Sequence, residues 1–445
     1  MAMLSDLIAR LGEKSIAFFQ WYLLNGRIVL DYVHNLFTST FRVFLVMTVL
    51  FTSIYLFMSL FILFKRKRIN EKEYDIKDAP FVSVQIPTRN ELIALRCAEK
   101  CLEFDYPKEK FEILIGDDSD DLYVSEELMK FAEIHDNVKV IKREKNIGFK
   151  PGNLNNMLEY SKGEILVLFD SDFTPDRDFL KRIVYPFLDN PDVSAVQSRW
   201  NFNNFDQNLV TVIAANIVYV FHHVVLSFMN RFDSGSLCGS AEAIRKKDLI
   251  ELGKWKSGSL TEDVEFSLRI HKSNKKIVYL PDLECNSDVP FKAKDLYKQQ
   301  MRWAYGVIGS YQEHLPSILK KKSLSIKRKV LSMCAGFGYL LPLLILFLFF
   351  FGLTSFVTDR PAPIDIVKFL SETGINILLT SGMIIASVFA LYQAKKSKHI
   401  LRMILGSFTI GLVTTYYVNK GIIKSIFKKP MDWYLLNKSE YKASQ

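Results

Sequence analysis

The stretch Ile165-Leu166-Val167-Leu168-Phe169-Asp170-Ser171-Asp172 indicates the fold more clearly than any other part of the chain. Five consecutive apolar residues that end at charged ones are typical of a strand buried in a parallel sheet. Two carboxylates, one residue apart, follow directly at the carboxyl end of this strand. Ligands of open α/β sheets bind beyond such strand ends, and hard ions prefer carboxylate oxygens. The sequence therefore predicts that Asp170 and Asp172 bind Mg²⁺ or Mn²⁺, although an isolated pair of this kind also occurs by chance.

Strands and helices alternate on the N-terminal side of this stretch. Periodicity predicts helices over residues 92–104 and 122–135. Apolar, β-branched runs predict three further strands, at Val82–Pro87, Phe111–Ile115 and Val138–Ile141. Alternating strands and helices predict an α/β domain with a doubly wound, mostly parallel sheet.

Composition indicates a membrane protein rather than a nucleic-acid-binding one. The 445 residues are 49% hydrophobic and 13% aromatic, with a net charge of +10. The basic residues gather near the ends of apolar runs, where the positive-inside rule places them. These clusters are Lys65–Arg68, Lys320–Lys322, Lys327–Lys329, Lys395–Lys396 and Lys428–Lys429.

Two N-terminal segments are predicted to associate with the membrane. Residues 42–64 are nearly uncharged and long enough to span a bilayer, with the carboxyl end in the cytosol. Residues 1–41 mix apolar and charged residues around Trp21, which favours an interfacial helix over a second span. No signal-peptide pattern is expected at this N-terminus.

The remaining boundaries follow from hydropathy. A cytosolic domain is predicted over residues 70–290, with amphipathic interface helices over 291–329, and residues 210–230 are predicted to form a packed amphipathic helix. A transmembrane region over 330–427 precedes a cytosolic tail at 428–445.

Within the C-terminal transmembrane region, residues 330–357 and 375–394 are each long enough to cross the membrane, the first with a kink at Pro342. Residues 401–418 fit either one crossing or a re-entrant hairpin, because basic clusters flank them on both sides.

The cysteines fit a reducing, cytosolic environment. There are five, an odd number, and they are scattered along the chain. Cys97 and Cys101 are one helical turn apart, a spacing that a metal pair or ordinary packing would explain. Packing is favoured because no histidine or second cysteine pair accompanies them at zinc-site spacing.

Two polar segments follow predicted strands. A carboxylate of Asp117–Asp121 could accept the N–H of a nucleotide base, although aspartates are also common in solvated turns. Lys150–Asn156 places a cation, a glycine and an asparagine at a helix entry. That arrangement suits a diphosphate, or it is a plain helix-entry loop.

Two further motifs lie near the end of the soluble region. Thr261-Glu262-Asp263 fits a helix N-terminus, and Asp263 could also act as a general base toward a hydroxyl group. Gln299-Gln300-Met301-Arg302-Trp303 combines a guanidinium for phosphate oxygens with an indole on which a sugar ring can stack. An interfacial helix would explain Trp303 alone, but it explains Gln299 and Arg302 poorly.

This ordered set resembles the inverting family 2 glycosyltransferases, in the membrane-embedded branch that holds cellulose, curdlan, mannan and hyaluronan synthases. The resemblance covers roughly residues 80–310 and the flanking helices in outline. Further matching segments are Ile86–Glu91, Lys150–Asn153, Val196–Trp200 and Leu237–Ser240. It implies a GT-A-type nucleotide-sugar domain inserted between transmembrane helices, a nucleotide-diphosphate sugar donor, a glycan or lipid acceptor, and no nucleic acid.

The resemblance also implies roles for individual residues. Asp263 would be the catalytic base, with Glu262 beside it, and Asp172 would ligate the metal with Asp170 nearby. Cys238, Gly239 and Trp303 would contact the acceptor. The nucleotide sugar would be bound by Thr88, Asn90, Glu91, Asp117, Asp118, Lys150, Asn153, Asp170, Gln299 and Arg302.

The product is left open at this point. The sequence has no FxVTxK-type gating loop like that of bacterial cellulose synthases, and its compact outline is closer to mannan-synthase-like members. Inverting, β-linked polymer synthesis at the cell membrane is the first expectation. Transfer of one sugar to a lipid or polyprenyl phosphate, and a non-catalytic nucleotide-sugar-binding membrane protein, are the alternatives.

Overall fold

The computed structural model describes residues 2–64, 79–360 and 365–431. The chain divides into two compact units, one formed by Met1–Ile54 with Leu340–Met383 and the other by Tyr55–Tyr339 with Ile384–Gln445. The basic cluster Lys65–Arg68 and most of the expected tail at 428–445 lie outside the described residues.

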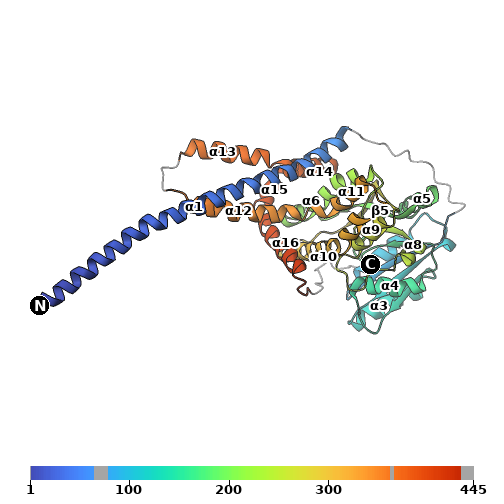
Figure 1. The fold of residues 1–445 in the computed structure, drawn as a ribbon. Helices are drawn as coiled ribbons and strands as arrows, with labels where there is room; N and C mark the ends of the chain where they lie inside the picture. The colour runs from blue at the N-terminus through green and yellow to red at the C-terminus, as the bar shows by residue number, and fades with distance from the viewer. Residues whose placement is uncertain (1, 65–78, 361–364, 432–445) are drawn as a thin grey trace. The chain divides into compact units, whose positions relative to one another are not determined.

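The larger unit is built on a seven-stranded sheet with the order β3-β2-β1-β4-β6-β5-β7 (Figure 1). Only β6 runs antiparallel to its neighbours β4 and β5. The predicted α/β fold with a mostly parallel sheet is therefore confirmed. The strands are β1 (Val82–Thr88), β2 (Phe111–Asp117), β3 (Val138–Lys142), β4 (Ile165–Leu168), β5 (Val193–Phe202), β6 (Glu242–Arg245) and β7 (Lys276–Ser287).

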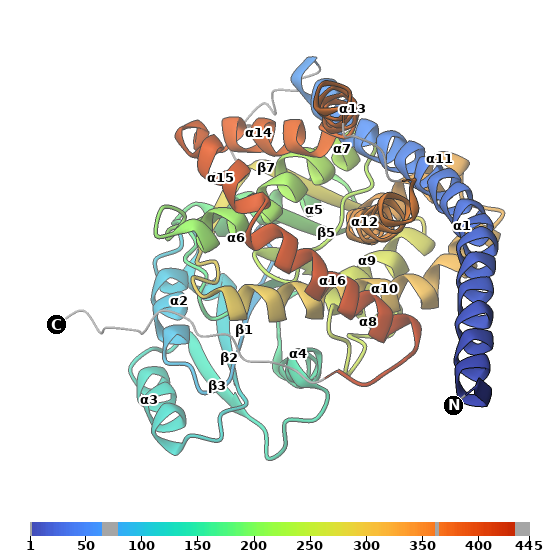
Figure 2. The ribbon, with the colours of Figure 1, turned by 90° about the vertical axis from the view of Figure 1, so that its left-hand side faces the viewer.

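Helices cover both sides of strands β1 to β3. Figure 2 shows α2 (Ile93–Leu102) and α3 (Leu122–Glu133) on one side and α4 (Phe149–Tyr160) on the other. Cys97 and Cys101 lie on the buried face of α2 as free thiols. Apolar residues three and four apart on α2 and α4 face the sheet, and the two helices thus form the layers on its two sides.

The second half of the domain contains elements that alternation alone did not predict. The predicted packed helix at 210–230 is confirmed, and it comprises α6 (Leu209–Val220), a π-helical turn η2 (Phe221–Leu226) and α7 (Ser227–Asn230). Most of this apolar stretch is buried inside the protein. The other elements are η1 (Lys108–Lys110), α5 (Phe179–Asp189), α8 (Lys246–Glu251) and α9 (Glu262–Lys272).

A long helix, α10 (Ala293–Lys320), carries the last sequence motif. It lies alongside α16 (Ile410–Ile426), as Figure 2 shows. The rings of Tyr297 and Tyr417 stack between them with centroids 5.1 Å apart. Also in this unit are α11 (Ile326–Phe337), η3 (Ser397–His399) and α15 (Ile400–Ser407).

The smaller unit consists of apolar helices. The first part of α1 (Ala2–Phe64) packs on α12 (Leu340–Thr358) through phenylalanine rings, with α13 (Ile366–Leu379) following. Helix α1 runs without a break through the boundary expected between residues 41 and 42. Its uncharged run and its amphipathic run both favour helix, and nothing between them ends it.

Several helices are long and apolar enough to cross a membrane. Among the described residues these are Gly12–Phe64, Leu209–Asn230 and Leu340–Thr358, and two bent helix pairs would add two more. Two of the expected spans are interrupted helices. The stretch 330–357 is split between α11 and α12, so the break precedes Pro342 rather than falling at it. The stretch 375–394 bends by 52° between α13 and α14 (Gly382–Gln393).

Candidate active site

The predicted site residues gather at one edge of the sheet. Thr88, Asp117 and Asp170 are at or just beyond the carboxyl ends of β1, β2 and β4. Strand β6 is reversed, so its first residue, Glu242, pairs with Leu168 at the same edge. One antiparallel strand therefore brings the loop before Glu242 opposite the carboxylates that follow β4.

The two aspartates after β2 occupy different surroundings. Asp117 is fully buried and accepts hydrogen bonds from the Ser119 amide at 2.8 Å and the Ser125 hydroxyl at 2.5 Å. Asp118 accepts two hydrogen bonds from Arg143, at 2.7 and 2.5 Å. Asp117 is thus held at the end of β2 by Ser119 and Ser125, whereas Asp118 forms an ion pair with Arg143.

Asn90 fixes the acidic turn from the end of β1. Its backbone has a φ of 54°, a conformation that asparagine tolerates better than most residues. Its side-chain oxygen accepts from the amides of Asp120 and Asp121 at 2.9 and 3.0 Å. The Thr88 hydroxyl donates to the carbonyl of Glu91 at 3.1 Å. Both residues thus shape the loop beside the acidic turn.

Three of the predicted motifs converge on one amine. Lys150 Nζ lies 2.7 Å from Asp170 Oδ1, 3.2 Å from Glu262 Oε1 and 2.5 Å from the carbonyl oxygen of Gly239. Desolvation would lower the pKa of Lys150, but the Asp170 and Glu262 carboxylates outweigh it and raise that pKa. The lysine is therefore a fixed positive charge at the point where a diphosphate is expected.

Asn153 lies away from this group, although the sequence placed it with Lys150. Its side chain is buried and donates to the carbonyl of Gly116 at 2.8 Å. A Cβ at position 116 would lie 2.1 Å from the Asn153 oxygen, so helix α4 approaches β2 closely there. The structure thus gives Asn153 a part in holding α4 on the sheet.

The carboxylates after β4 have the chemistry of a divalent-ion site. Asp170 is about a third exposed, and its amide donates to the Ser240 hydroxyl at 2.8 Å. Asp172 is nearly buried and accepts from the Ser287 hydroxyl at 2.7 Å, while Ser171 donates to Glu91. Two oriented carboxylates at a partly exposed strand end are oxygen donors that suit Mg²⁺ or Mn²⁺.

The loop before β6 is held by a carboxylate that no motif indicated. Glu242 is fully buried and accepts from the amides of Gly239 at 2.9 Å and Cys238 at 3.2 Å. Burial first, and then the nearby Asp263, raise the pKa of Glu242 to about 8. Sequence analysis missed it because a single glutamate inside a short strand has no diagnostic spacing.

Glu262 and Asp263 begin helix α9 directly beside that loop. Gly239 has a φ of +88°, and a Cβ there would lie 3.4 Å from Asp263 Oδ2 and 3.6 Å from Lys150 Nζ. Desolvation first and the Glu262 carboxylate second raise the pKa of Asp263 to about 7. A carboxyl group with that pKa can exchange a proton with a hydroxyl group near neutral pH.

The last motif faces the same region from α10. Arg302 Nη1 donates to the carbonyl of Leu260 at 3.0 Å, one residue before the Thr261-Glu262-Asp263 motif. Burial lowers the pKa of Arg302, and Glu262, Asp170 and Asp263 oppose that effect, so the guanidinium lies within their field. Gln299 and Trp303 are half-buried on the same helix.

Similarities to known proteins extend over both halves of the chain. Residues 165–392, just over half of the chain, match the family described as glycosyl transferase family group 2. The protein named "Probable glucomannan 4-beta-mannosyltransferase 7" from Oryza sativa subsp. japonica is 31% identical over 261 residues. That alignment covers 56% of this chain but only 44% of the rice protein, so the chain matches less than half of this relative's length.

A solved structure shares the fold. The mannosyltransferase PcManGT from Pyrobaculum calidifontis, determined in complex with GDP-Man and Mn²⁺, superposes with a TM-score of 0.60 at 17% identity. The superposition covers 90% of this chain and all of the other. Because the family match extends over more than half of the chain, we conclude that the protein belongs to glycosyl transferase family group 2.

Proposed function

We propose that the protein is a membrane glycosyltransferase that transfers a hexose from a nucleotide diphosphate to a hydroxyl group, with inversion at the anomeric carbon. The observation that carries this proposal is the convergence on Lys150 of Asp170, Glu262 and Gly239. This group of side chains thus contains a cation for a diphosphate and a carboxylate for a metal. It also lies beside the candidate base.

In this mechanism Asp263 accepts the proton of the acceptor hydroxyl as the oxygen attacks the anomeric carbon. The bond between that carbon and the diphosphate oxygen breaks, and the diphosphate leaves with the electron pair. Lys150 and Arg302 stabilise the negative charge that develops on the leaving group. Attack from the face opposite the diphosphate would turn an α-linked donor into a β-linked product.

Asp172 and Asp170 would hold the divalent ion. When bound, Mg²⁺ or Mn²⁺ supplies positive charge to the diphosphate oxygens. The residues present fit this ion because both are carboxylates at one strand end: Asp172 accepts from the Ser287 hydroxyl, and Asp170 is paired with Lys150. Asp118, paired with Arg143, is the carboxylate proposed to accept from the nucleotide base.

GDP-mannose is the donor we favour. The names of the rice relative and of the Pyrobaculum structure both indicate mannosyl transfer, and the latter was determined with GDP-Man and Mn²⁺. We propose a β-linked polysaccharide as the product. Transfer of a single sugar to a lipid or polyprenyl phosphate is the second candidate, supported by helices that are apolar enough to lie in a membrane, where such lipids are found.

Radiolabelled donors test the proposal. The full-length protein in nanodiscs with Mn²⁺ would be offered UDP- and GDP-sugars, and products would be separated by size and by organic extraction. We expect a large, mannosidase-sensitive product from GDP-mannose. A single labelled lipid would instead support the second candidate.

Asp263→Asn, prepared in parallel, is the matched control for catalysis. It should bind the donor but transfer sugar far more slowly than the wild type. If the wild-type protein binds a nucleotide sugar yet transfers none from any donor in the panel, the proposed function is wrong and a non-catalytic role takes its place.

A further inference from the structure

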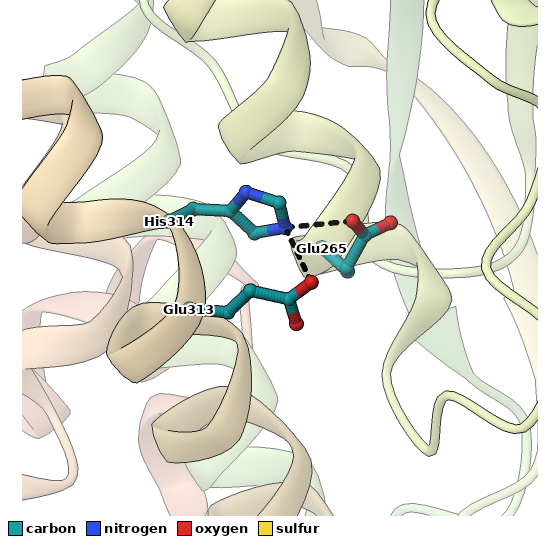
Figure 3. A group of neighbouring side chains, drawn as sticks. All are labelled: Glu265, Glu313 and His314. Carbon is teal, nitrogen blue, oxygen red and sulfur yellow. Dashed lines mark hydrogen bonds and ion pairs between the residues drawn. The ribbon is translucent and has the colours of Figure 1, made fainter.

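A buried ion-pair network joins the helix of the proposed base to the helix of the last motif. Glu265 on α9 and His314 on α10 are 2.7 Å apart, measured from Oε1 to Nε2 (Figure 3). Glu313 Oε1 lies 3.9 Å from the same imidazole nitrogen. The Glu265 side chain is only 3% exposed and that of His314 is 12% exposed, whereas that of Glu313 is 45% exposed.

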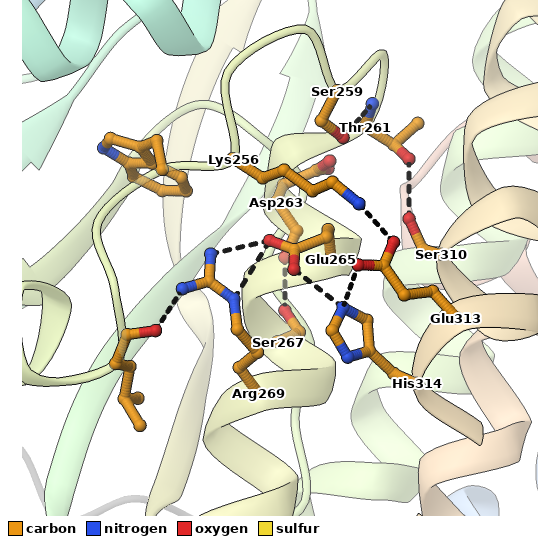
Figure 4. A network of polar contacts seen from close by, with 12 residues as sticks. Lys256, Ser259, Thr261, Asp263, Glu265, Ser267, Arg269, Ser310, Glu313 and His314 are labelled. Atoms are coloured by element: carbon orange, nitrogen blue, oxygen red, sulfur yellow. Dashed lines mark hydrogen bonds and ion pairs between the residues drawn. The ribbon is translucent and has the colours of Figure 1, made fainter. Parts of the chain in front are cut away.

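Two cations complete this network, as Figure 4 shows. Arg269 donates to Glu265 Oε2 at 2.6 and 3.1 Å and to the carbonyl of Leu252 at 2.5 Å. Lys256 pairs with Glu313 at the exposed end. Each acid therefore has a cationic side chain as its partner, and the two carboxylates are balanced by Arg269 and Lys256 without any bound ion.

The network is one of several contacts between α10 and the segment that contains the base; others include Leu268 with Ile318. About two turns nearer the last motif, a Cβ on Gly306 would lie 2.6 Å from the Thr261 side chain, so the two backbones approach closely. Ser310 and Thr261 hydroxyls are 3.5 Å apart, and Arg302 donates to Leu260. These contacts fix the start of α9, while Glu265 and His314 fix its first full turn.

Asp263 is carried directly by this turn. It precedes Glu265 by two residues on the same helix, and its carbonyl accepts from the Ser267 hydroxyl at 2.7 Å. The Ser267 oxygen in turn accepts from the Leu237 amide at 2.9 Å, which ties α9 to the loop that contains Gly239. A rotation of α9 would therefore move the Asp263 carboxylate relative to both Gly239 and Arg302.

We infer that Glu265 and His314 are positioning residues for the catalytic base: the buried hydrogen bond between them, backed by Arg269, sets the orientation of Asp263 toward the acceptor. Burial would raise the pKa of Glu265, but hydrogen bonds from His314 and Arg269 outweigh it and lower that pKa. The carboxylate thus stays charged, as the pair requires. This inference rests on the proposed function.

The test compares the same chemical change at a buried and an exposed position. Glu265→Gln removes the buried charge, and Glu313→Gln, one residue before His314, removes an exposed charge from the same network. Transfer rates would be normalised to donor-binding sites titrated by calorimetry, so that loss of folded protein does not count. We expect Glu265→Gln to lower kcat on the order of 10- to 100-fold, with donor Kd within about twofold, because small misplacements of a catalytic group are costly.

Two results would support the inference further. Glu313→Gln should keep kcat within about twofold of wild type, since exposed ion pairs contribute little. His314→Gln, whose amide can still donate to Glu265, should keep more activity than His314→Leu. This second pair of variants also serves if Glu265→Gln does not fold.

The opposite results would overturn it. If normalised kcat is the same for Glu265→Gln, Glu313→Gln and the wild type, the network only stabilises the fold. Equal activity of His314→Gln and His314→Leu would lead to the same conclusion. An inactive wild type, in contrast, would defeat the proposed function and the inference together.

Discussion

Four carboxylates, those of Asp170, Glu242, Glu262 and Asp263, lie within the electrostatic field of Lys150. Lys150 does not cancel the repulsion among these acids, so a neighbouring carboxylate adds to desolvation in raising the pKa of Asp263 and that of Glu242. Asp263 and Glu242 have pKa values of about 7 and 8 as a result, with desolvation as the first cause for both. At the residue scale, the site is thus prepared for proton transfer near neutral pH.

Replacement of the proposed base tests this assignment most directly. Asp263→Asn keeps the size of the side chain and removes its ability to accept a proton at neutral pH. We expect kcat for sugar transfer to fall by about 10²- to 10⁴-fold, with donor Kd little changed. Steady-state kinetics and calorimetry would measure the two quantities, and a loss of less than tenfold would contradict the role.

The pH dependence of transfer should report the pKa of Asp263. The base acts in its deprotonated form, so kcat/KM should fall as the pH decreases through about 7. Glu262→Gln removes the like charge that is the second cause of the raised pKa, so the midpoint of this fall should move to lower pH. An unchanged or higher midpoint in pH–rate profiles would show that Glu262 does not act on Asp263.

Removal of divalent metal should stop the reaction. We expect EDTA to abolish transfer and Mn²⁺ to restore it, because the diphosphate would lose its neutralising charge.

Asp172→Asn should raise the Mn²⁺ concentration needed for half-maximal rate at least about tenfold, since it removes one oxygen ligand. Asp176→Asn, at an exposed position on the following loop, is the control; an equal effect of both changes would contradict the ligand assignment.

At the scale of elements, α16 approaches α10 most closely beside the last motif. A Cβ on Gly421 would lie 2.3 Å from the carbonyl oxygen of Met301 and 3.3 Å from Ala304. Residue 421 therefore has to be glycine for the two helices to stay at this separation. The C-terminal segment is in this way part of the support for Arg302 and Trp303.

A single methyl group should disturb this support. Gly421→Ala is expected to destabilise the protein by about 1–3 kcal/mol, the usual cost of overpacking. Gly411→Ala on the same helix is the matched control, because a Cβ there would meet its nearest neighbour at 3.5 Å. It should be neutral or slightly stabilising. Thermal melting in detergent would compare them, and equal melting temperatures would contradict the close approach.

The first four strands were predictable from the sequence, but the last three were not. Strands β1 to β4 are apolar runs bounded by polar turns, so local pattern suffices. Strand β6 has four residues, and β5 and β7 mix polar with apolar side chains and pair across long separations in sequence. Breaks such as the 61° bend between α15 and α16 depend on packing, which hydropathy does not describe.

The same contrast holds for the candidate site. Asp170, Glu262 and Lys150 could be proposed from motifs, because each motif is short and follows a predicted strand or precedes a helix. That these residues meet at the amine of Lys150 depends on the order of the strands in the sheet. Glu242, Glu265 and His314 belong to no sequence motif. Residues that support a site are recognised only when distant segments are seen together.

At the scale of the whole molecule, apolar helices accompany a polar catalytic domain. The described residues hold three helices that are long and apolar enough to cross a bilayer. We expect the full-length protein to remain in the membrane pellet after high-salt and alkaline carbonate washes, and to be released by detergent. Immunoblotting of the fractions would measure this, and release by salt alone would show a peripheral attachment instead.

The pairing of β6 with β4 has a consequence for how the chain folds during synthesis on the ribosome. The neighbours β3, β2, β1 and β4 use only Val82 to Leu168, so they can pair soon after these residues emerge. The free edge of β4 then waits for Glu242–Arg245, and β7 is complete only at Ser287. Unpaired edges invite pairing with other chains, and nascent domains fold from the N-terminus. Translation speed between Leu168 and Arg245 therefore sets how long each nascent chain exposes the edge of β4 to its neighbours on a polysome.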